Sequence, residues 1–484
     1  MNTGSKTQRS RIAIVSIFLL TAGLGCLCLP GGIIPKIPSN QVPSPTPPPV
    51  TQIPPVTNGP LNAQGPWLLM ETDQGLWAAN PDGSGLKQIT DVDYWQGDIQ
   101  KAVQPSGNGV VFISPGGNDL HNMALNLATL PDGKITKITD LTSAQTEAFA
   151  SSGGPVVPGF EALRAVGEQL SYAWSPDGTQ LAFAGVMDGP SADIYLYNAT
   201  TQKVSRVSQD DAQDFLPSWS PDGKHLLYPA AVGFGTGAWM TMSGVWSADG
   251  NGNNVTQLYK STSSGEEILG WLDNTTAVMD TWSPLCGRSL LRLYDVVSKQ
   301  QSMLNKDCVI SASVNSLRGE ALFATTSGQY LLKADNRKPV LVGHDLATRI
   351  ELWRSYKDLF IVKLKDGGVD TVGSGEMDRQ SSPVKAPSES LDVAEYGAIW
   401  GWTSKDGSQP GVWISGPGMD IGQIFKNKAH LPIWDSQNNL LFFAPKDGGG
   451  ESIYRATFNA NYKDLSVAAS INTDVHFLAW MGGH

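Results

Sequence analysis

Apolar and polar positions alternate in short runs along most of the chain, from about residue 67 to residue 480. Segments such as Leu181-Ala-Phe183 and Ile194-Tyr-Leu196-Tyr have the period-two pattern of a strand with one buried face. Residues that favour turns separate the runs. A set of four runs recurs roughly every 40–45 residues, which is the spacing of propeller blades. The pattern therefore predicts a chain of short antiparallel strands.

Two neighbouring copies show the repeating unit best. Trp174 and Trp219 lie 45 residues apart, and each is followed by Ser-Pro-Asp-Gly. Proline fixes φ at the first central position of a turn, aspartate suits the second, and glycine accepts the positive φ that follows. Each motif therefore predicts a tight turn between the first and second strands of a four-stranded unit.

This unit resembles the WD-type propeller repeat of TolB-like proteins, which also occurs in the propellers of the prolyl oligopeptidase family. The residues that carry the resemblance are Trp174–Gly178, Asp193–Tyr195 and Trp219–Gly223, with weaker copies at Asn80–Gly83 and Trp434–Ser436. The resemblance implies an all-β fold, a single closed propeller of four-stranded antiparallel blades. It implies no particular activity, because propellers host unrelated functions.

The number of blades follows from the hairpins formed by the two middle strands. We predict eight blades, with seven or nine open as alternatives. The segment Val475–Trp480 is an inner strand without a hairpin, and the hairpin at Trp67 has no inner strand before it, so we expect the last strand to complete the first blade. Nine candidate hairpins begin near Trp67, Val110, Leu181, Leu226, Ala277, Ala321, Leu359, Ala398 and Leu440.

Residues 1–29 have the organisation of an export segment. Lys6, Arg9 and Arg11 precede an apolar run, Ile12–Leu24. The sequence Gly23-Leu-Gly-Cys26 resembles a bacterial lipoprotein box, in which Cys26 would be lipidated. An uncleaved membrane anchor and free secretion stay open as alternatives. All three place the rest of the chain outside the cytoplasm, in the periplasm or beyond.

A proline-rich linker follows at residues 30–64, and we expect the propeller to occupy residues 65–484. Eleven prolines between Pro30 and Pro60 favour an extended polyproline II conformation. At roughly 3.1 Å per residue, such a linker spans on the order of 100 Å. It would let an anchored domain stand away from the envelope surface.

Composition narrows the classes of partner. The chain has 34 Lys and Arg against 45 Asp and Glu, a net charge of −11, and this acidic balance argues against nucleic acid. Of the four cysteines, Cys26 and Cys28 lie in the export segment. We predict a disulfide between the other two, Cys286 and Cys308, because an exported location is oxidising.

Searches for catalytic and metal-binding motifs find little. There is no G-x-S-x-G motif, so we expect the hydrolase domain of the prolyl oligopeptidase family to be absent. The six histidines lack metal-binding spacing, and His225 and His476 fall in strands, which favours structural roles. The segment Asp249–Asn253 has oxygen-bearing residues at alternate positions, like a calcium loop, but a simple turn explains it better. We expect no cofactor and no metal.

Long connections lie on one face of a propeller, together with the first residues of each inner strand. The segments 140–167 and 229–244 are the longest, and we take their face as the candidate functional face. Its channel mouth could be a solvated acidic rim, a cation site or a dock for a basic peptide or ligand. The candidate residues at this mouth are Glu168, Asp214, Glu266, Glu267, Arg349, His430 and Asp474.

These features predict a monomeric, membrane-tethered, extracytoplasmic propeller that acts as a non-enzymatic binding module for an envelope protein or a glycan. One alternative is a glycan-processing enzyme that uses carboxylates at the channel mouth as acid and base. Another is a component of an envelope complex, as in TolB-like proteins. TolB itself carries an additional N-terminal domain, whereas here the linker leads directly into the first blade.

Overall fold

The computed structural model describes most of the chain after residue 58. The described residues are 59–91, 99–105, 107–115, 120–151, 158–167, 171–234, 240–261, 266–283, 288–304, 307–353, 359–373, 379–381, 388–393, 400–404, 410–416, 419–458 and 461–482. The predicted export segment and most of the predicted linker lie outside them. No helix within the described ranges is long and apolar enough to cross a membrane.

The turn motifs form as their residue types require. In the Ser-Pro-Asp-Gly turn after Trp174, the Asp177 carboxylate accepts hydrogen bonds from the Ser175 hydroxyl (2.6 Å) and the Thr179 amide (3.0 Å). Gly178 has a φ of 70°, which L-residues rarely adopt. The turn after Trp219 repeats this arrangement, so the same local chemistry sets the same hairpin twice.

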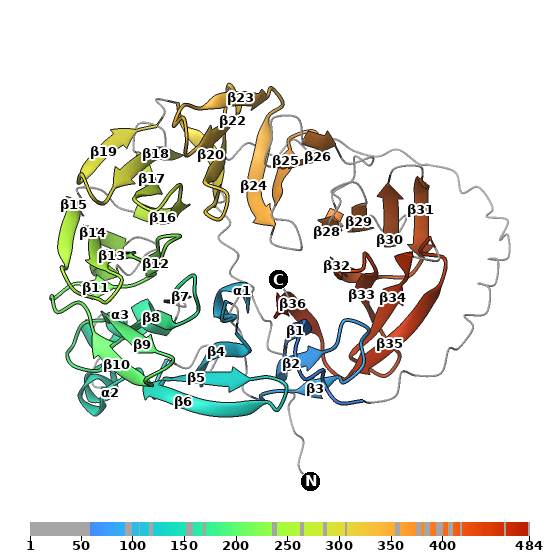
Figure 1. Cartoon of the computed structure of the whole chain (residues 1–484), viewed down its shortest axis with the longest axis horizontal. Coiled ribbons are helices and arrows are strands. Elements are labelled where there is room, and N and C mark those ends of the chain that lie inside the picture. The colour runs from blue at the N-terminus through green and yellow to red at the C-terminus, as the bar shows by residue number, and fades with distance from the viewer. Residues whose placement is uncertain are drawn as a thin grey trace, which may run out of the picture. The chain divides into compact units, whose positions relative to one another are not determined.

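The described strands fall into nine groups in chain order, each built on one antiparallel hairpin (Figure 1). The first group combines both ends of the described chain: β1 (Trp67–Thr72), β2 (Gly75–Ala79), β3 (Lys87–Gln88) and β36 (Val475–Met481). The second contains α1 (Ile99–Ala102), β4 (Gly109–Ser114), β5 (Ala124–Thr129) and β6 (Lys134–Asp140).

The third group includes two helices that come before its first strand. In the fourth group, the inner strand is divided into two short strands. The third group consists of α2 (Ala144–Ser151), α3 (Pro158–Gly167), β7 (Tyr172–Trp174), β8 (Gln180–Gly185), β9 (Asp193–Asn198) and β10 (Lys203–Arg206). The fourth consists of β11 (Gln213–Asp214), β12 (Ser218–Trp219), β13 (His225–Phe234), β14 (Met240–Asp249) and β15 (Thr256–Lys260).

The remaining five groups have four strands each. The fifth and sixth are β16 (Glu266–Trp271), β17 (Thr276–Ser283), β18 (Arg288–Asp295), β19 (Gln300–Met303), and β20 (Val309–Asn315), β21 (Glu320–Thr325), β22 (Gly328–Lys333), β23 (Val340–Gly343). The seventh to ninth are β24 (Ala347–Trp353), β25 (Leu359–Leu364), β26 (Val369–Val372), β27 (Arg379–Ser381), then β28 (Ser388–Val393), β29 (Trp400–Ser404), β30 (Gly411–Gly416), β31 (Met419–Phe425), and finally β32 (His430–Trp434), β33 (Leu440–Pro445), β34 (Glu451–Ala456), β35 (Leu465–Ile471).

All nine predicted hairpins are present within the described ranges, but their grouping into sheets depends on one contact. A single strand pairing, Ser289 opposite Val309, joins the fifth and sixth groups into one eight-stranded sheet. By hydrogen bonding the described strands therefore make eight sheets, whereas by hairpins they make nine groups. The number of blades in a closed ring stays a prediction.

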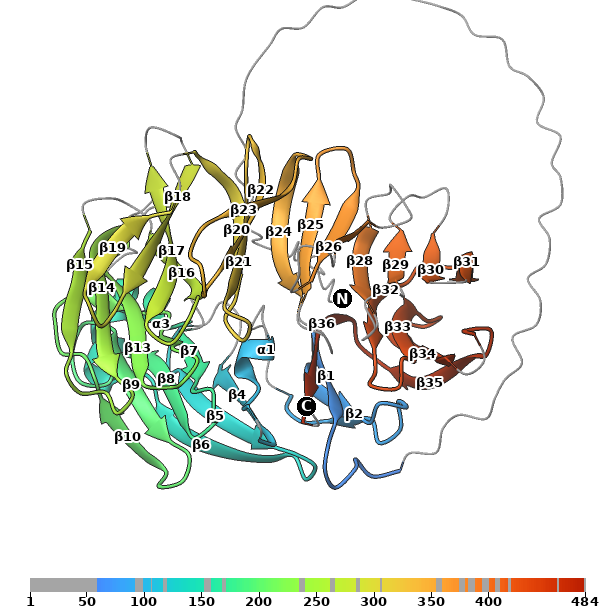
Figure 2. The ribbon, with the colours of Figure 1, turned by 45° about the horizontal axis from the view of Figure 1, so that its top comes forward.

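The last strand completes the first sheet, as predicted from the inner strand without a hairpin at one end and the hairpin without an inner strand at the other. β36 pairs antiparallel with β1 from Trp67 opposite Met481 to Thr72 opposite Val475, and the two strands lie side by side in both views (Figure 1 and Figure 2). Residues just before β1 pack on the same sheet. Leu61 is buried, and Asn80 binds the Asn62 amide (2.8 Å) and the Pro60 carbonyl (3.2 Å).

Tryptophans at the ends of inner strands link consecutive groups. The Trp219 indole N–H donates to the Ala173 carbonyl (3.0 Å) on the inner strand before it, and Trp480 donates to the Trp434 carbonyl (3.0 Å) in the same way. The Trp174 indole donates to the Ala102 carbonyl at the end of α1 (3.1 Å), and the Trp271 indole donates to the Ser218 hydroxyl (3.1 Å). These bonds explain why a tryptophan precedes the Ser-Pro-Asp-Gly motif: it holds neighbouring groups together across the apolar core.

The two segments predicted as long loops have regular structure. Residues 140–167 contain α2 and α3, and α3 buries Ala162, Leu163, Ala165 and Val166 on one side, the spacing of an amphipathic helix. Within 229–244, strands β13 and β14 extend through most of the predicted loop as a long hairpin. The prediction of open loops was wrong there, because apolar burial gave these segments their own secondary structure.

Candidate functional site

Antiparallel topology divides the connections of each group between two faces. The turns from first to second and from third to fourth strand, such as 175–179 and 249–254, lie on one face, which we call the turn face. The connections from second to third strand and between groups lie on the other, which we call the long-connection face. The segments 186–192 and 208–213, together with α2 and α3, belong to the long-connection face.

Backbone contacts fix the helices of this face to the third group. Thr142 bridges Val186, and the Thr146 hydroxyl donates to the Val186 carbonyl (3.2 Å). Helix α3 contacts β8 and β11. The helices therefore form a built part of the surface over the third and fourth groups.

Beneath this surface, a buried polar cluster joins the third and fourth groups. Arg206 donates from Nη2 to Asp193 Oδ2 (2.7 Å) and from Nε to the Ser208 carbonyl (2.8 Å). The amide of Asp214 donates to the Ala192 carbonyl (2.8 Å), which places β11 beside the start of β9. Burial raises the pKa of Asp193 to about 7 even though the charge of Arg206 opposes the shift.

Asp214, predicted at the channel mouth, is fully buried in this cluster. Its side chain is 0% exposed, and a hydrogen bond from the Ser208 side chain opposes the effect of burial on its pKa. Burial raises the pKa of Asp214 well above its usual value, and the charge of Asp210 adds to the shift. The residue begins an inner strand as expected, but α3 packs against that strand, so Asp214 is not open to solvent.

The other predicted residues are distributed over several groups. Glu266 and Glu267 begin β16, the first buried and the second exposed. Arg349, near the start of β24, is exposed and forms an ion pair with Glu351. Glu168 lies outside the described residues. Glu266, Glu267 and Arg349 lie at or near the starts of their strands, and their exposure differs from one to the next, while their role at a channel mouth stays a prediction.

A pair of carboxylates lies on the fifth group. Glu267 stands directly opposite Asp280 in the register of β16 and β17, so both side chains emerge from the same side of the sheet. Burial raises the pKa of Asp280 to about 6, and the charge of Glu267 adds to this shift. Sequence reasoning missed Asp280, because its pairing with Glu267 depends on the strand register.

His430 and Asp474 are brought together at the ninth group. His430 Nε2 forms a short hydrogen bond with the buried carboxylate of Glu451, whose other oxygen accepts a bond from the Val475 amide (3.1 Å). Asp474 is exposed beside this contact, and His476 pairs with Asp73 (2.9 Å). These contacts tie β32, β34, β36 and β1 together at one edge.

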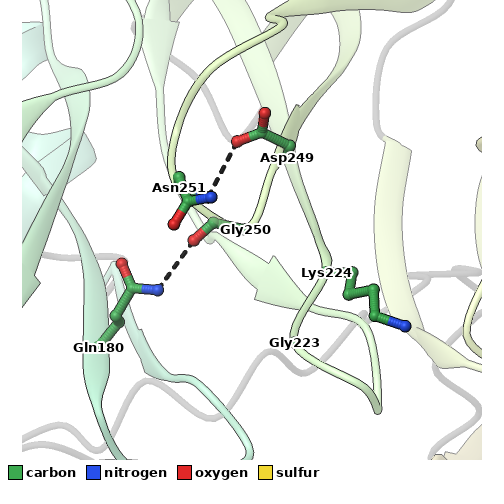
Figure 3. Close-up of a pocket in the computed structure, with 6 residues that line it drawn as sticks. All are labelled: Gln180, Gly223, Lys224, Asp249, Gly250 and Asn251. Carbon is green, nitrogen blue, oxygen red and sulfur yellow. Dashed lines mark hydrogen bonds between the residues drawn. The ribbon is translucent and has the colours of Figure 1, made fainter.

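A small hollow on the turn face shows what the predicted calcium-like segment does. It is lined by Gln180, Gly223, Lys224, Asp249, Gly250 and Asn251 (Figure 3). Asp249 Oδ1 accepts bonds from the amides of Asn251 (2.9 Å) and Asn253 (2.9 Å), as expected for a turn. Gln180 Nε2 donates to the Gly250 carbonyl (2.9 Å) and so links the third and fourth groups.

Of the four cysteines, Cys308 is the one that lies among the described residues. Cys308 is disulfide-bonded, and Cys286, the partner that we predict, lies outside the described residues, as do Cys26 and Cys28. Across the ranges given above, no group of three or more His, Cys, Asp or Glu side chains is arranged to hold a metal ion.

Sequence comparisons connect the repeats to known proteins. No family model matches the chain. A stretch of 106 residues, 21% of the chain, is 32% identical to the Tol-Pal system protein TolB of Alcanivorax borkumensis. Another of 62 residues is 32% identical to the uncharacterized peptidase YuxL of Bacillus subtilis. The matches span 24% and 9% of those two proteins, so the chain is similar to only a small part of each.

Comparison with solved structures supports the fold. A crystal structure described as the eukaryotic initiation factor matches 86% of the chain with a TM-score of 0.50 and 12% identity, and the match covers 98% of that chain. Together with the four-stranded antiparallel groups and the Ser-Pro-Asp-Gly turns, these likenesses identify the described part of the chain as a β-propeller with TolB-like repeats.

Proposed function

We propose that this protein is a membrane-tethered, extracytoplasmic binding module whose propeller binds an envelope protein on the long-connection face. The observation that carries the proposal is the built surface over the third and fourth groups, where α2, α3 and the long β13–β14 hairpin are added to a rigid repeat. Additions of this kind on a rigid scaffold commonly hold binding sites.

The proposed location of the module is supported by one sequence comparison and by residues 1–64. The likeness to TolB, a protein of the Tol-Pal system, supports an envelope partner. Residues 1–29 supply an export segment, with Cys26 as the lipidation candidate, and residues 30–64 supply the reach of the tether. The module acts as a monomer, without a cofactor, and attaches to the membrane through its N-terminus alone.

Site-specific photo-crosslinking in the native host tests this proposal. A photoreactive residue at Gly189, where a side chain meets open space on the long-connection face, should capture a defined envelope protein. The matched position is Leu317, which is 80% exposed in a first-to-second-strand turn on the other face and should capture none. Equal capture from both positions, or capture from Leu317 alone, would contradict the proposed face.

A second candidate function is glycan processing, and the pair Glu267 and Asp280 favours it. The raised pKa of Asp280 and the exposed carboxylate of Glu267 resemble the unequal acid and base that glycosidic cleavage needs. Asp280→Asn and Glu267→Gln should each abolish turnover of envelope oligosaccharides by the full chain. Turnover that survives both substitutions, or its absence in the unmodified protein, would exclude this candidate.

A further inference from the structure

A short segment before the first strand contacts both ends of the first sheet's chain. We call this segment, residues 60–66, the strap. Its Leu61 side chain is buried in the same apolar cluster as Ala479 and Met481 of β36. A Cβ atom added at Gly65 would lie 2.8 Å from the Met481 carbonyl oxygen, so the backbone of the strap passes directly against the end of the last strand.

One side chain of the turn between β2 and β3 holds the strap. Asn80 Oδ1 accepts a hydrogen bond from the Asn62 amide (2.8 Å), and Asn80 Nδ2 donates to the Pro60 carbonyl (3.2 Å). The Trp67 indole, at the start of β1, donates to the Asn62 carbonyl (3.0 Å). Because Asn80 is buried, release of the strap would leave its amide without partners and without water, which is costly.

The position of Asn80 has a different role in the third, fourth and fifth groups. Counted through the strand registers from the inner tryptophan of each group, the equivalent residues are Asn198, Asp249 and Asp295, at the ends of the third strands. Each of these side chains accepts hydrogen bonds from two backbone amides that follow it within four residues. In those groups the residue closes its own turn.

In the first group a neighbouring residue closes the turn. Asp82 Oδ1 accepts bonds from the Ser84 amide (3.0 Å) and hydroxyl (2.6 Å). Asn80 Nδ2 also donates to Ser84 Oγ (2.9 Å), whereas its Oδ1 binds the strap. At Gly85, a Cβ atom would lie 2.9 Å from the Pro60 carbonyl oxygen. The turn of the first group is thus modified at two positions to receive a segment from outside the repeat.

We propose that the strap is a closing device, which holds the last strand on the first sheet. β36 comes from the far end of the described chain and pairs with β1 along one edge. The strap and the hairpin of β1 and β2 are close in sequence, so their contacts require little loop-closure entropy. Leu61 then extends the apolar surface on which Met481 is buried, and this burial favours β36 in its paired position.

This inference goes beyond the proposed function, because it concerns the completion of a sheet and not the binding face. It also has a consequence for processing of the chain. A cut before residue 59 would separate the linker from the domain and leave the last strand held. Loss of residues 60–62 would loosen β36.

Hydrogen exchange of the full-length protein, followed by mass spectrometry, tests the inference. The site variant is Asn80→Ala, which removes the side-chain bonds to the strap. The control variant is Asn198→Ala, which removes the bonds of the equivalent side chain to its own turn. We expect Asn80→Ala to accelerate exchange in peptides from the strap and from β36 at least about tenfold, with the sixth group unchanged. Asn198→Ala should leave the exchange rate of β36 unchanged.

The unmodified protein provides a second measurement that needs no variant. At denaturant concentrations below the unfolding transition, peptides from the strap and from β36 should lose their protection together, because the contacts make them one cooperative unit.

Several results would overturn the inference. Faster exchange in the strap with an unchanged rate in β36 would show that the strap does not hold the last strand. Equal acceleration in all nine groups would assign Asn80 to general stability, and equal acceleration of β36 by Asn198→Ala would assign the effect to the loss of any turn bond. In the unmodified protein, loss of protection in β36 while the strap stays protected would separate the two segments.

Discussion

At the scale of single residues, the aspartates of this propeller differ in their surroundings: some are hydrogen-bonded within local turns, and others are buried between groups. The turn aspartates Asp177 and Asp222 are saturated by local donors, so sequence alone predicts their role. Asp214 could be placed at the start of an inner strand by counting back from Trp219. Its burial could not be predicted, because it depends on α3 and β9, which reach it from elsewhere in the chain.

Replacement of Asp214 by asparagine should stabilise the protein at neutral pH. The folded-state pKa of Asp214 lies well above the usual 3.8, so the folded protein binds more protons than the unfolded chain between these values. Stability therefore falls as pH rises through this window, and Asp214→Asn removes that loss. Thermal unfolding should show a gain of about 1–3 kcal/mol at neutral pH and little or none near pH 4. A lower melting temperature at neutral pH would contradict this account.

Replacement of Trp480 by phenylalanine should separate the hydrogen bond from the packing of the inner-strand tryptophans. The variant keeps a large aromatic ring but loses the bond from the indole to the Trp434 carbonyl. We expect a loss of about 1–2 kcal/mol in chemical unfolding. The matched variant is Trp77→Phe, because the Trp77 indole N–H is buried without a partner among the described residues. Equal losses in both variants would show that the bond contributes nothing.

At the scale of elements, hairpins were predictable and their assembly was not. Local turn residues such as Gly178 and Gly223 set the turns between inner and second strands, and all nine predicted hairpins of the middle strands are found in the described ranges. The joining of two groups by Ser289 and Val309 depends on how far one sheet bends toward the next. Helices α2 and α3 are absent from the prediction because the repeat pattern stops there, which predicts only a long connection between two blades.

Deletion of residues 475–484 should destabilise the fold strongly. The deletion exposes the edge of β1 and removes Val475, Trp480 and Met481 from buried positions. Burial of one large apolar side chain contributes roughly 1.5–3 kcal/mol, against a total of about 5–15 kcal/mol for a domain. Differential scanning calorimetry and light scattering should therefore show a lower melting temperature and association. A monomeric protein that melts at the original temperature would contradict the pairing of β36 with β1.

Peptide mapping under non-reducing conditions should find Cys286 joined to Cys308. Cys308 lies directly before Val309, the residue that bridges the fifth and sixth groups, so a bond to the β17–β18 connection would reinforce their only direct strand pairing in the described chain. Loop-closure entropy gives about 3 kcal/mol for a loop of this size. Free thiols at both positions, or a bond from Cys308 to Cys26 or Cys28, would contradict the pairing.

At the scale of the whole molecule, the sequence separates an export segment, a linker and a repeat domain by composition alone. The described residues bear on the last of these. Among them, Leu61 is buried and Asn80 holds both Pro60 and Asn62, so contacts with the first sheet begin before the first strand. That boundary could not be read from composition, because Pro60 still belongs to the proline-rich run.

Attachment to the membrane should depend on Cys26 if the export segment is a lipoprotein signal. Cys26→Ser should abolish incorporation of a clickable fatty acid in the native host, because the thiol that would carry the lipid is gone. Cys28→Ser is the matched control and should leave the labelling unchanged. Labelling that persists in Cys26→Ser, or that never occurs in the unmodified protein, would leave an uncleaved anchor or free secretion.

The docking of residues 60–62 on Asn80 also determines how the domain would bear mechanical load. A pull on the linker reaches the propeller through Asn80 and then through β1, which lies inside its sheet between β2 and β36. A strand with ladders on both sides must shear two rows of hydrogen bonds at once, whereas an edge strand unzips one bond at a time. If residues 30–64 are the tether that we propose, it enters the domain at a strand that resists extraction, and stretching would strain the linker before it opened the sheet.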